Sequence, residues 1–185
     1  MEDKILFSLP GNMELTQLLA KQLMLGIGKA EIRSFPDRET YIRIDSEMND
    51  KTAILICSLN DPNPKVVPLL FMARTLRDLG AKKLCLVSPY LPYMRQDKQF
   101  HAGEAITAVL FAQLISSYFD CMMTIDPHLH RIHKLSEVYS LSGLLTLHAT
   151  KKISDWIVNH VSYPVLIGPD AESKQWVSEI ADYHK

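Results

Sequence analysis

Three side chains with complementary hydrogen-bonding properties follow an apolar run in this 185-residue chain: Arg95, Gln96 and Asp97. Arginine presents a planar fork of donors that suits phosphate, glutamine both donates and accepts, and aspartate accepts from amino or hydroxyl groups. The preceding segment, Ser88–Met94, contains two prolines and two tyrosines, which stiffen the backbone and offer apolar surface to a planar base. The cluster has the chemistry of a nucleotide-binding loop, and a surface loop with a local ion pair explains the same residues equally well.

A second polar segment, Asp126–His133, holds three histidines and one aspartate. Its proline permits an extended or turned backbone, so that His128 could ligate a metal while Asp126 binds a hard ion such as Mg²⁺ directly or through water. A zinc site is disfavoured, because the three cysteines lie singly in other, apolar segments. The alternative is a polar loop whose histidines hydrogen-bond to the neighbouring backbone.

A third segment, Gly168–Lys174, lies between an apolar run and an amphipathic stretch. Asp170 is placed to cap the helix that follows, with Ser173 three residues later. The cap is a sufficient structural explanation, and the same geometry holds a carboxylate at the carboxyl end of a strand.

Strands and helices must position these loops. Short apolar runs predict strands, and longer stretches with apolar residues at helical spacing predict helices. In chain order we predict strands at 5–9, 30–34, 40–44, 52–58, 83–88, 120–125 and 164–168, helices at 13–25, 64–79, 104–117, 149–160 and 171–183, and a loose connection at 140–146. The alternation is typical of a doubly wound α/β fold with a mostly parallel sheet, in which ligands gather at the carboxyl ends of the strands.

One further loop joins the two strands predicted at 30–34 and 40–44, which form a hairpin around Phe35–Glu39. Four loops therefore have polar groups that an ordinary solvent-facing turn does not need: residues 35–39, 89–103, 126–133 and 168–174.

The composition is that of an ordinary globular protein, with 47% hydrophobic and 22% charged residues. A formal net charge of -1 provides no field that attracts a polyanion, so we expect no nucleic-acid partner. The five-residue apolar run after Lys4 is too short for a signal peptide or a membrane span, so we expect a cytoplasmic protein without a membrane partner. Cys57, Cys85 and Cys121 are predicted to be reduced, buried thiols.

Four segments together resemble the ribose-phosphate pyrophosphokinases, also called phosphoribosyl pyrophosphate synthetases, in their order and intervals: Phe35–Glu39, Tyr93–Asp97, Asp126–His128 and Gly168–Asp170. Enzymes of this family transfer the diphosphoryl group of ATP to ribose 5-phosphate, which gives phosphoribosyl pyrophosphate and AMP and requires Mg²⁺. The resemblance implies a phosphoribosyltransferase-like open, mostly parallel sheet flanked by helices. It also implies a nucleotide-binding domain over residues 1–143 and the start of a second, similar domain over residues 144–185.

The resemblance assigns roles to individual residues. It implies an adenine-recognition loop that a neighbouring subunit lends, so that the protein is at least a homodimer, and a second group that binds the rest of ATP, with Arg95 at the polyphosphate. Lys98 and His101 are expected to add phosphate contacts. The site residues implied are Phe35, Asp37, Glu39, Arg95, Gln96 and Asp97 for ATP and His128 and Asp170 for Mg²⁺, with no catalytic residue assigned within the chain.

The chain departs from the family pattern at three places. Arg38 stands where a glycine is common, which changes the bulk or the backbone conformation of the adenine loop. His130, Arg131 and His133 replace a glutamine- and aromatic-rich pattern, and Glu172–Lys174 replaces a pair of small residues. These differences indicate a divergent branch.

Family members continue for roughly a hundred residues, the size of another α/β unit, beyond the segment that this chain resembles. That part carries a basic loop and the loop that holds ribose 5-phosphate, so we expect this chain alone to bind ATP weakly and to be inactive. One alternative is a non-catalytic regulatory or assembly subunit of a synthetase. Another is a phosphoribosyltransferase-like enzyme that uses the product.

Overall fold

The chain consists of two structural units, Met1–Thr146 and Leu147–Lys185. The computed structural model describes residues 3–171 and 173–183. The border between the units falls within β8 (Gly143–Leu147).

The first unit is built on a mostly parallel, six-stranded sheet with the strand order β2-β1-β5-β6-β7-β8. Besides β8, its strands are β1 (Lys4–Ser8), β2 (Gly26–Ile27), β5 (Thr52–Ile56), β6 (Lys83–Ser88) and β7 (Cys121–Ile125). The strand order reverses between β1 and β5, because the chain first winds outward from β1 to β2 and later winds in the opposite direction from β5. This reversal is where open α/β sheets usually open a crevice at the carboxyl ends of their strands.

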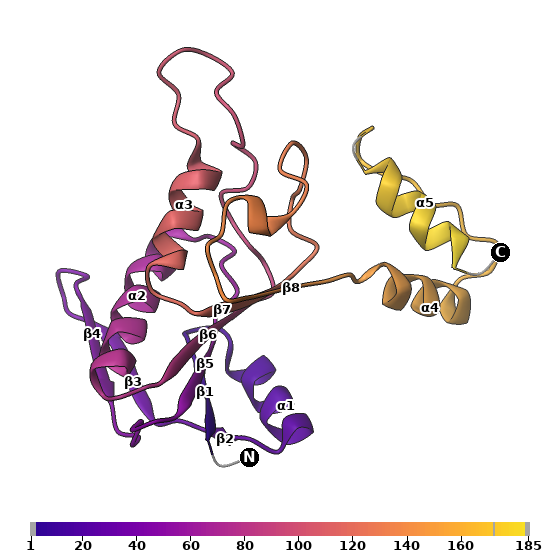
Figure 1. The fold of residues 1–185 in the computed structure, drawn as a ribbon. Coiled ribbons are helices and arrows are strands. Elements are labelled where there is room, and N and C mark those ends of the chain that lie inside the picture. Colours follow the sequence, from indigo (N-terminus) through magenta and orange to yellow (C-terminus); the bar gives the residue numbers. More distant parts are fainter. Residues whose placement is uncertain (1–2, 172, 184–185) are drawn as a thin grey trace. The chain divides into compact units, whose positions relative to one another are not determined.

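Helices cover both faces of this sheet, as Figure 1 shows: α1 (Met13–Leu23) lies on one side, and α2 (Asn63–Asp78) and α3 (Thr107–Ser116) lie on the other. The core forms where the near-continuous apolar strands meet the apolar faces of α2 and α3. Its fully buried members include Phe7, Leu55, Leu86, Leu69, Met72, Ala112 and Ile115. Such burial on both faces leaves polar side chains only at the strand ends, where the candidate loops begin.

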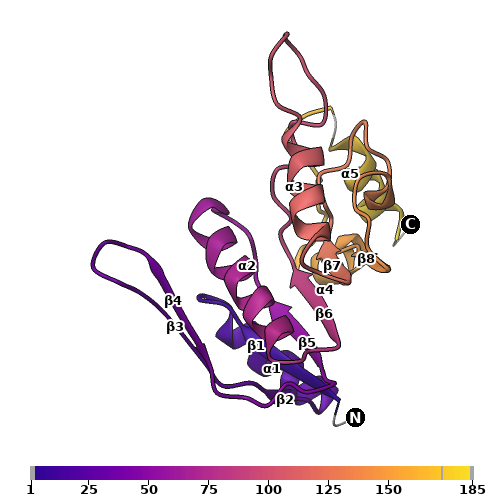
Figure 2. The same cartoon turned by 60° about the vertical axis from the view of Figure 1, so that its left-hand side comes forward.

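The predicted hairpin is confirmed as an antiparallel pair, β3 (Ala30–Ser34) and β4 (Thr40–Ile44), in which Ser34 lies opposite Thr40. Figure 2 shows it projecting away from the six-stranded sheet. The tip is therefore a separate element that the sheet does not enclose.

Three predicted elements are wrong. The segment expected to be a loose connection forms the edge strand β8. Gly26–Ile27, for which no strand was predicted after the helix at 13–25, forms β2 and pairs with β1. Pro164–Gly168 was expected to be a strand but has no ladder partner in the described residues, and Val165 and Ile167 are 83% and 87% exposed. A strand requires a neighbour for its backbone hydrogen bonds, which a sequence pattern does not reveal.

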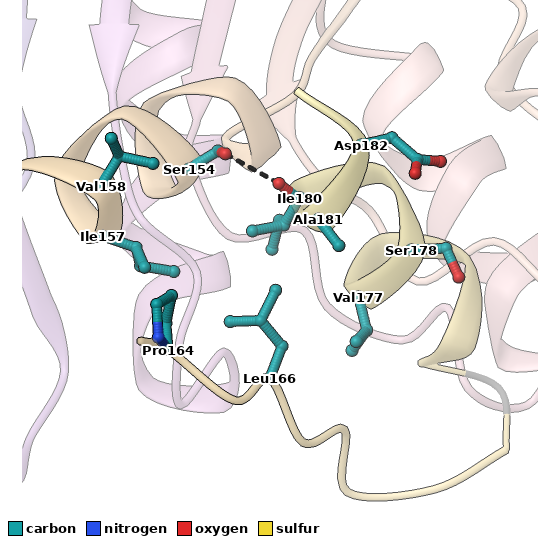
Figure 3. Close-up of a pocket in the computed structure, with 10 residues that line it drawn as sticks. All are labelled: Ser154, Ile157, Val158, Pro164, Leu166, Val177, Ser178, Ile180, Ala181 and Asp182. Atoms are coloured by element: carbon teal, nitrogen blue, oxygen red, sulfur yellow. Dashed lines mark hydrogen bonds between the residues drawn. The ribbon is translucent and has the colours of Figure 1, made fainter. Parts of the chain in front are cut away.

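The second unit contains the helices α4 (Thr150–His160) and α5 (Lys174–Asp182), which contact each other through a hydrogen bond from Ser154 Oγ to the Ile180 carbonyl (2.7 Å). The predicted helix at 171–183 thus begins three residues later than expected. An open, mainly apolar pocket of about 520 Å³ lies between α4, α5 and the segment around Leu166, and Figure 3 shows the residues that line it. The apolar faces of this unit are only partly covered.

The prediction of three reduced cysteines is wrong for two of them. Cys85 and Cys121 lie directly opposite each other in β6 and β7, with their Cα atoms 4.7 Å apart, and they form a disulfide. The two cysteines are 36 positions apart in the sequence, which conceals that their strands are neighbours in register. Cys57 is a buried free thiol, and burial raises its pKa to about 11, against a smaller opposite effect of Lys65.

In the part of the chain that the structure describes, no helix is long and apolar enough to cross a membrane.

Candidate nucleotide-binding site

The loops after β6 and β7 leave neighbouring parallel strands at the same edge of the sheet. The loop after β6 is fixed near its start, because Ser88 Oγ (2.7 Å) and the Leu59 N–H (3.2 Å) both donate to the Tyr90 carbonyl. Tyr93 then adopts a left-handed backbone conformation (φ 62°), and Met94 is buried. Met94 therefore anchors the backbone in the core directly before Arg95, where the candidate site begins.

Arg95 and Gln96 present their side chains without a hydrogen-bond or ion-pair partner among the described residues. Their backbone is anchored, because the Gln96 carbonyl accepts a hydrogen bond from the Ala108 N–H (3.2 Å) in the first turn of α3. That N–H has no partner within the helix, so the loop satisfies it. A fixed backbone whose guanidinium and amide groups have no partner among the described residues is suited to binding a ligand.

Asp97, by contrast, is fully engaged. Its Oδ1 accepts from Arg131 Nη1 (3.0 Å) and its Oδ2 accepts from the Arg131 backbone N–H (3.0 Å). Burial of the carboxylate raises its pKa, but the two hydrogen bonds and the charge of Arg131 together outweigh that effect and hold the pKa below its usual range. The structure therefore brings Asp97 together with a residue of the loop after β7, to which sequence reasoning assigned no role.

The long loop between β6 and α3 is closed on itself at its far end. The Glu104 carboxylate accepts from the backbone N–H groups of Phe100 (2.7 Å) and His101 (3.0 Å) and pairs with His101 Nδ1 (2.8 Å). These bonds, the His101 side chain first, lower the pKa of Glu104. His101 is thus occupied in shaping the loop, while the Lys98 ammonium lies 4.9 Å from the Phe100 ring centre.

His128 follows β7 in a turn that begins with Asp126, whose φ of 40° places it in the left-handed region. Its imidazole is half-buried and has no hydrogen-bond partner in the described part of the chain. Among the residues that the structure describes, no three histidine, cysteine, aspartate or glutamate side chains converge into a metal-binding group. His128 alone suits an ion that is held mainly by phosphate oxygens and water.

Asp170 lies in the second unit, where Oδ1 accepts from the Ser173 N–H (2.8 Å) and Ser173 Oγ donates to the Asp170 carbonyl (2.6 Å). The prediction that Asp170 caps the helix is wrong in position, because α5 begins at Lys174 and Ser173 is its N-cap residue. The two bonds between Asp170 and Ser173 instead close the turn that precedes the helix. The neighbouring Glu172, at which the chain departs from the family pattern, lies outside the described residues.

The hairpin tip carries the other candidate residues. The Phe35 N–H donates to the Glu39 carbonyl (2.8 Å), and the Glu39 N–H donates to Asp37 Oδ1 (3.1 Å). Arg38 adopts a left-handed conformation (φ 73°), which is the conformation that glycine favours. The chain has therefore kept the backbone of a glycine turn with a larger residue. Figures 1 and 2 show the tip and the loop before α3 as separate projections, so one chain does not bring the two groups together.

Sequence reasoning also missed a polar group at the point where the strand order reverses. Buried Asn12 accepts from the Ser58 N–H (2.8 Å) and donates to the Pro10 carbonyl (2.9 Å), and Lys65 Nζ donates to the Ser58 carbonyl (2.9 Å). The asparagine after Pro10-Gly11, directly behind a strand, is the signal that could have revealed it.

Known proteins resemble this chain in sequence and in fold. A family model for the N-terminal domain of ribose phosphate pyrophosphokinase matches residues 4–118, more than half of the chain. The ribose-phosphate pyrophosphokinase of Saccharolobus solfataricus is 33% identical over 166 residues, covering 89% of this chain and 56% of the relative. That of Methanobrevibacter smithii is 30% identical over 174 residues, covering 91% and 56%.

Among solved structures, the phosphoribosylpyrophosphate synthetase of Mycobacterium smegmatis superposes with a TM-score of 0.85 at 24% identity, covering 98% of this chain and 61% of that one. The predicted open, mostly parallel sheet flanked by helices is thereby confirmed. This chain spans little more than half the length of the curated relatives that it matches. Sequence and fold agree with the resemblance drawn from the four loops, and the chain belongs to the ribose-phosphate pyrophosphokinase family.

Proposed function

We propose that this chain forms the ATP-binding part of a ribose-phosphate pyrophosphokinase. The reaction would transfer the diphosphoryl group of ATP to ribose 5-phosphate, giving phosphoribosyl pyrophosphate and AMP for nucleotide biosynthesis. The observation that carries the proposal is that the Arg95 and Gln96 side chains have no partner among the described residues. Their backbone is nevertheless held by the Ala108 N–H, and the next residue, Asp97, is bonded to Arg131 of the loop that contains His128.

In this proposal Arg95 binds the polyphosphate, because a guanidinium offers two parallel donors to phosphate oxygens. Gln96 donates to or accepts from the nucleotide. His128 would contact the Mg²⁺ that accompanies ATP, since Mg²⁺ commonly takes one or two protein ligands and completes its shell with phosphate and water. Asp170 is proposed as a further Mg²⁺-associated group. The bound ion would neutralise charge on the phosphates.

Titration calorimetry tests the role proposed for Arg95 by comparing Mg²⁺-dependent ATP binding of the wild-type chain and of Arg95→Ala. Loss of a charge-assisted contact predicts about tenfold to a hundredfold weaker binding. Arg74→Ala is the control, because Arg74 is an exposed residue of α2 paired with Asp78. Equal ATP affinity of wild type and Arg95→Ala would instead favour the non-catalytic subunit.

We propose that the hairpin tip reads adenine in a neighbouring copy of the chain, so that the protein is a homo-oligomer. Phe35, 40% exposed, would stack on the purine, while Asp37 or Glu39 accepts from the exocyclic amine. A mixing experiment tests the shared site. We expect the Phe35→Ala protein alone and the Arg95→Ala protein alone to lose ATP binding. When the two proteins are mixed and exchange subunits, part of the ATP binding should return, because some sites then combine an intact Phe35 with an intact Arg95. No recovery after demonstrated exchange would contradict the sharing.

We propose that the 185 residues alone bind ATP without forming phosphoribosyl pyrophosphate, and that residues 144–185 begin a second phosphoribosyltransferase-like domain. The chain covers 56% of its relatives' length, and none of its candidate residues is assigned to the sugar phosphate. Incubation with ATP, Mg²⁺ and ribose 5-phosphate should give no product. Product formation would overturn this.

We further propose a cytoplasmic location, where both proposed substrates are made and used. The Cys85–Cys121 disulfide is the feature that opposes it, because cytosolic thiols are kept reduced. Acid quenching of cells followed by thiol alkylation and peptide mass measurement would show which state the pair adopts in the cell.

A further inference from the structure

The pair formed by Asp97 and Arg131 differs from an ordinary surface ion pair. The Asp97 side chain is only 3% exposed, and Arg131 supplies a donor to each of its two oxygens, one from the guanidinium and one from the backbone. The residues are 34 positions apart and belong to the loops after β6 and β7. An exposed, screened pair contributes little, but a buried carboxylate depends on its partner.

Arg131 touches the loop after β6 at a second point. Its guanidinium carbon lies 5.3 Å from the centre of the Phe100 ring, on which the Lys98 ammonium also lies. The loop is thus held at residues 96, 97 and 100, through the Ala108 N–H, the Asp97 carboxylate and the Phe100 ring respectively. The side chains of Arg95 and Gln96, at the start of this held segment, have no hydrogen-bond or ion-pair partner among the described residues.

We infer that Asp97 and Arg131 are positioning residues, which tie the loop of residues 95–101 to the loop after β7 and so set the spacing between Arg95 and His128. This inference rests on the proposed ATP site and assigns Asp97 a role different from direct nucleotide contact. Both Asp97 oxygens already accept hydrogen bonds, and its low exposure leaves little room for a ligand group. Arg131 is three residues after His128, so a shift of one loop displaces both groups that would face the phosphates.

The first measurement needs no nucleotide. Amide hydrogen exchange of residues 95–101, followed by mass spectrometry, is compared in the wild-type 185-residue chain, Arg131→Ala, Arg131→Lys and Asp97→Asn. We call the Asp97–Arg131 pair the clasp. Without it, we expect the backbone amides of residues 95–101 to exchange about tenfold faster in Arg131→Ala. Arg131→Lys should restore part of the protection, because lysine keeps the positive charge but lacks the planar guanidinium. Unchanged exchange in Arg131→Ala would overturn the inference.

The second measurement is the Kd for Mg²⁺-ATP of the same variants and of the double variant Asp97→Asn/Arg131→Ala. We expect Arg131→Ala to bind ATP about tenfold more weakly, and the double variant to be no weaker than the weaker single one, because both changes break one unit. Additive losses would mean that each residue contacts ATP independently and would overturn the positioning role.

Arg77→Ala is the matched control, because Arg77 Nη2 also makes a long-range ion pair, with Asp120 Oδ2 at 2.7 Å, beside the amino ends of β6 and β7. It should lower stability while leaving ATP affinity unchanged. If Arg131→Ala does not fold, Arg131→Lys and Asp97→Asn still decide the outcome. If the wild-type chain binds no ATP, the proposed function is wrong. The hydrogen-exchange measurement would then still show whether Asp97 and Arg131 hold the loop in place.

Discussion

The two regions proposed to bind ATP are built in opposite ways. The loop of residues 95–101 is held by contacts from distant parts of its own chain, including Arg131 and α3. Within the described part of the chain, the hairpin tip, residues 35–39, is held by bonds within its own turn and by the neighbouring side chains of Arg33 and Tyr41. A loop that must keep phosphate ligands at fixed spacing benefits from cross-links, whereas a tip that meets a partner benefits from projecting freely.

The sharpest test of this contrast removes one aspartate from each region. Asp97→Ala deletes a buried carboxylate and leaves Arg131 unpaired, so we expect the free energy of unfolding to fall by about 2 kcal/mol. Asp37→Ala removes an exposed carboxylate of the tip and should change it by less than about 0.5 kcal/mol. Urea denaturation followed by circular dichroism measures both, and equal losses would break the comparison.

Acid should weaken the tied loop in a defined pH range. Because Arg131 holds the pKa of Asp97 below its unfolded value of about 3.9, the ionised carboxylate stabilises the fold above that pH and loses this effect as the pH falls through the lower folded-state pKa. The stability gap between wild type and Asp97→Asn is expected to be about 1 kcal/mol near pH 7 and to shrink below about pH 4.

The same comparison in an Arg131→Ala background is the control for this pH effect. There the gap should be small at every pH, since the cause of the lowered pKa has been removed. If the stability difference between wild type and Asp97→Asn does not shrink at low pH, the Asp97–Arg131 pair is not its cause.

The smallest expected effect lies in the hairpin. Arg38→Gly relieves a left-handed backbone that costs a residue with a Cβ about 1–2 kcal/mol, and the greater flexibility of unfolded glycine offsets part of this gain. We expect a net stabilisation of about 0.5 kcal/mol, or a rise in Tm of about 1–2 °C. Arg38→Ala keeps the Cβ and should give no gain. A lower Tm for Arg38→Gly would show that the arginine side chain stabilises the tip.

Sequence patterns predicted the parts of the molecule that local chemistry decides. Buried strands such as Lys83–Ser88 read as continuous apolar runs, and the rule that ligand loops follow strands placed Arg95 and His128 in loops at strand ends. The ion pair between Asp97 and Arg131 could not be predicted from the sequence, because it depends on which strands are neighbours and on their register. For the same reason β8 and the Cys85–Cys121 disulfide were missed.

The unpaired segment around Leu166 has a practical consequence for handling the chain. Val165 and Ile167 expose β-branched side chains on a stretch whose backbone has no ladder partner in the described residues, and Tyr163 beside them is 99% exposed. Such segments add to copies of themselves edge to edge, which is how aggregation begins. Concentrated samples should precipitate through this stretch first, and the Val165→Lys variant should stay in solution longer.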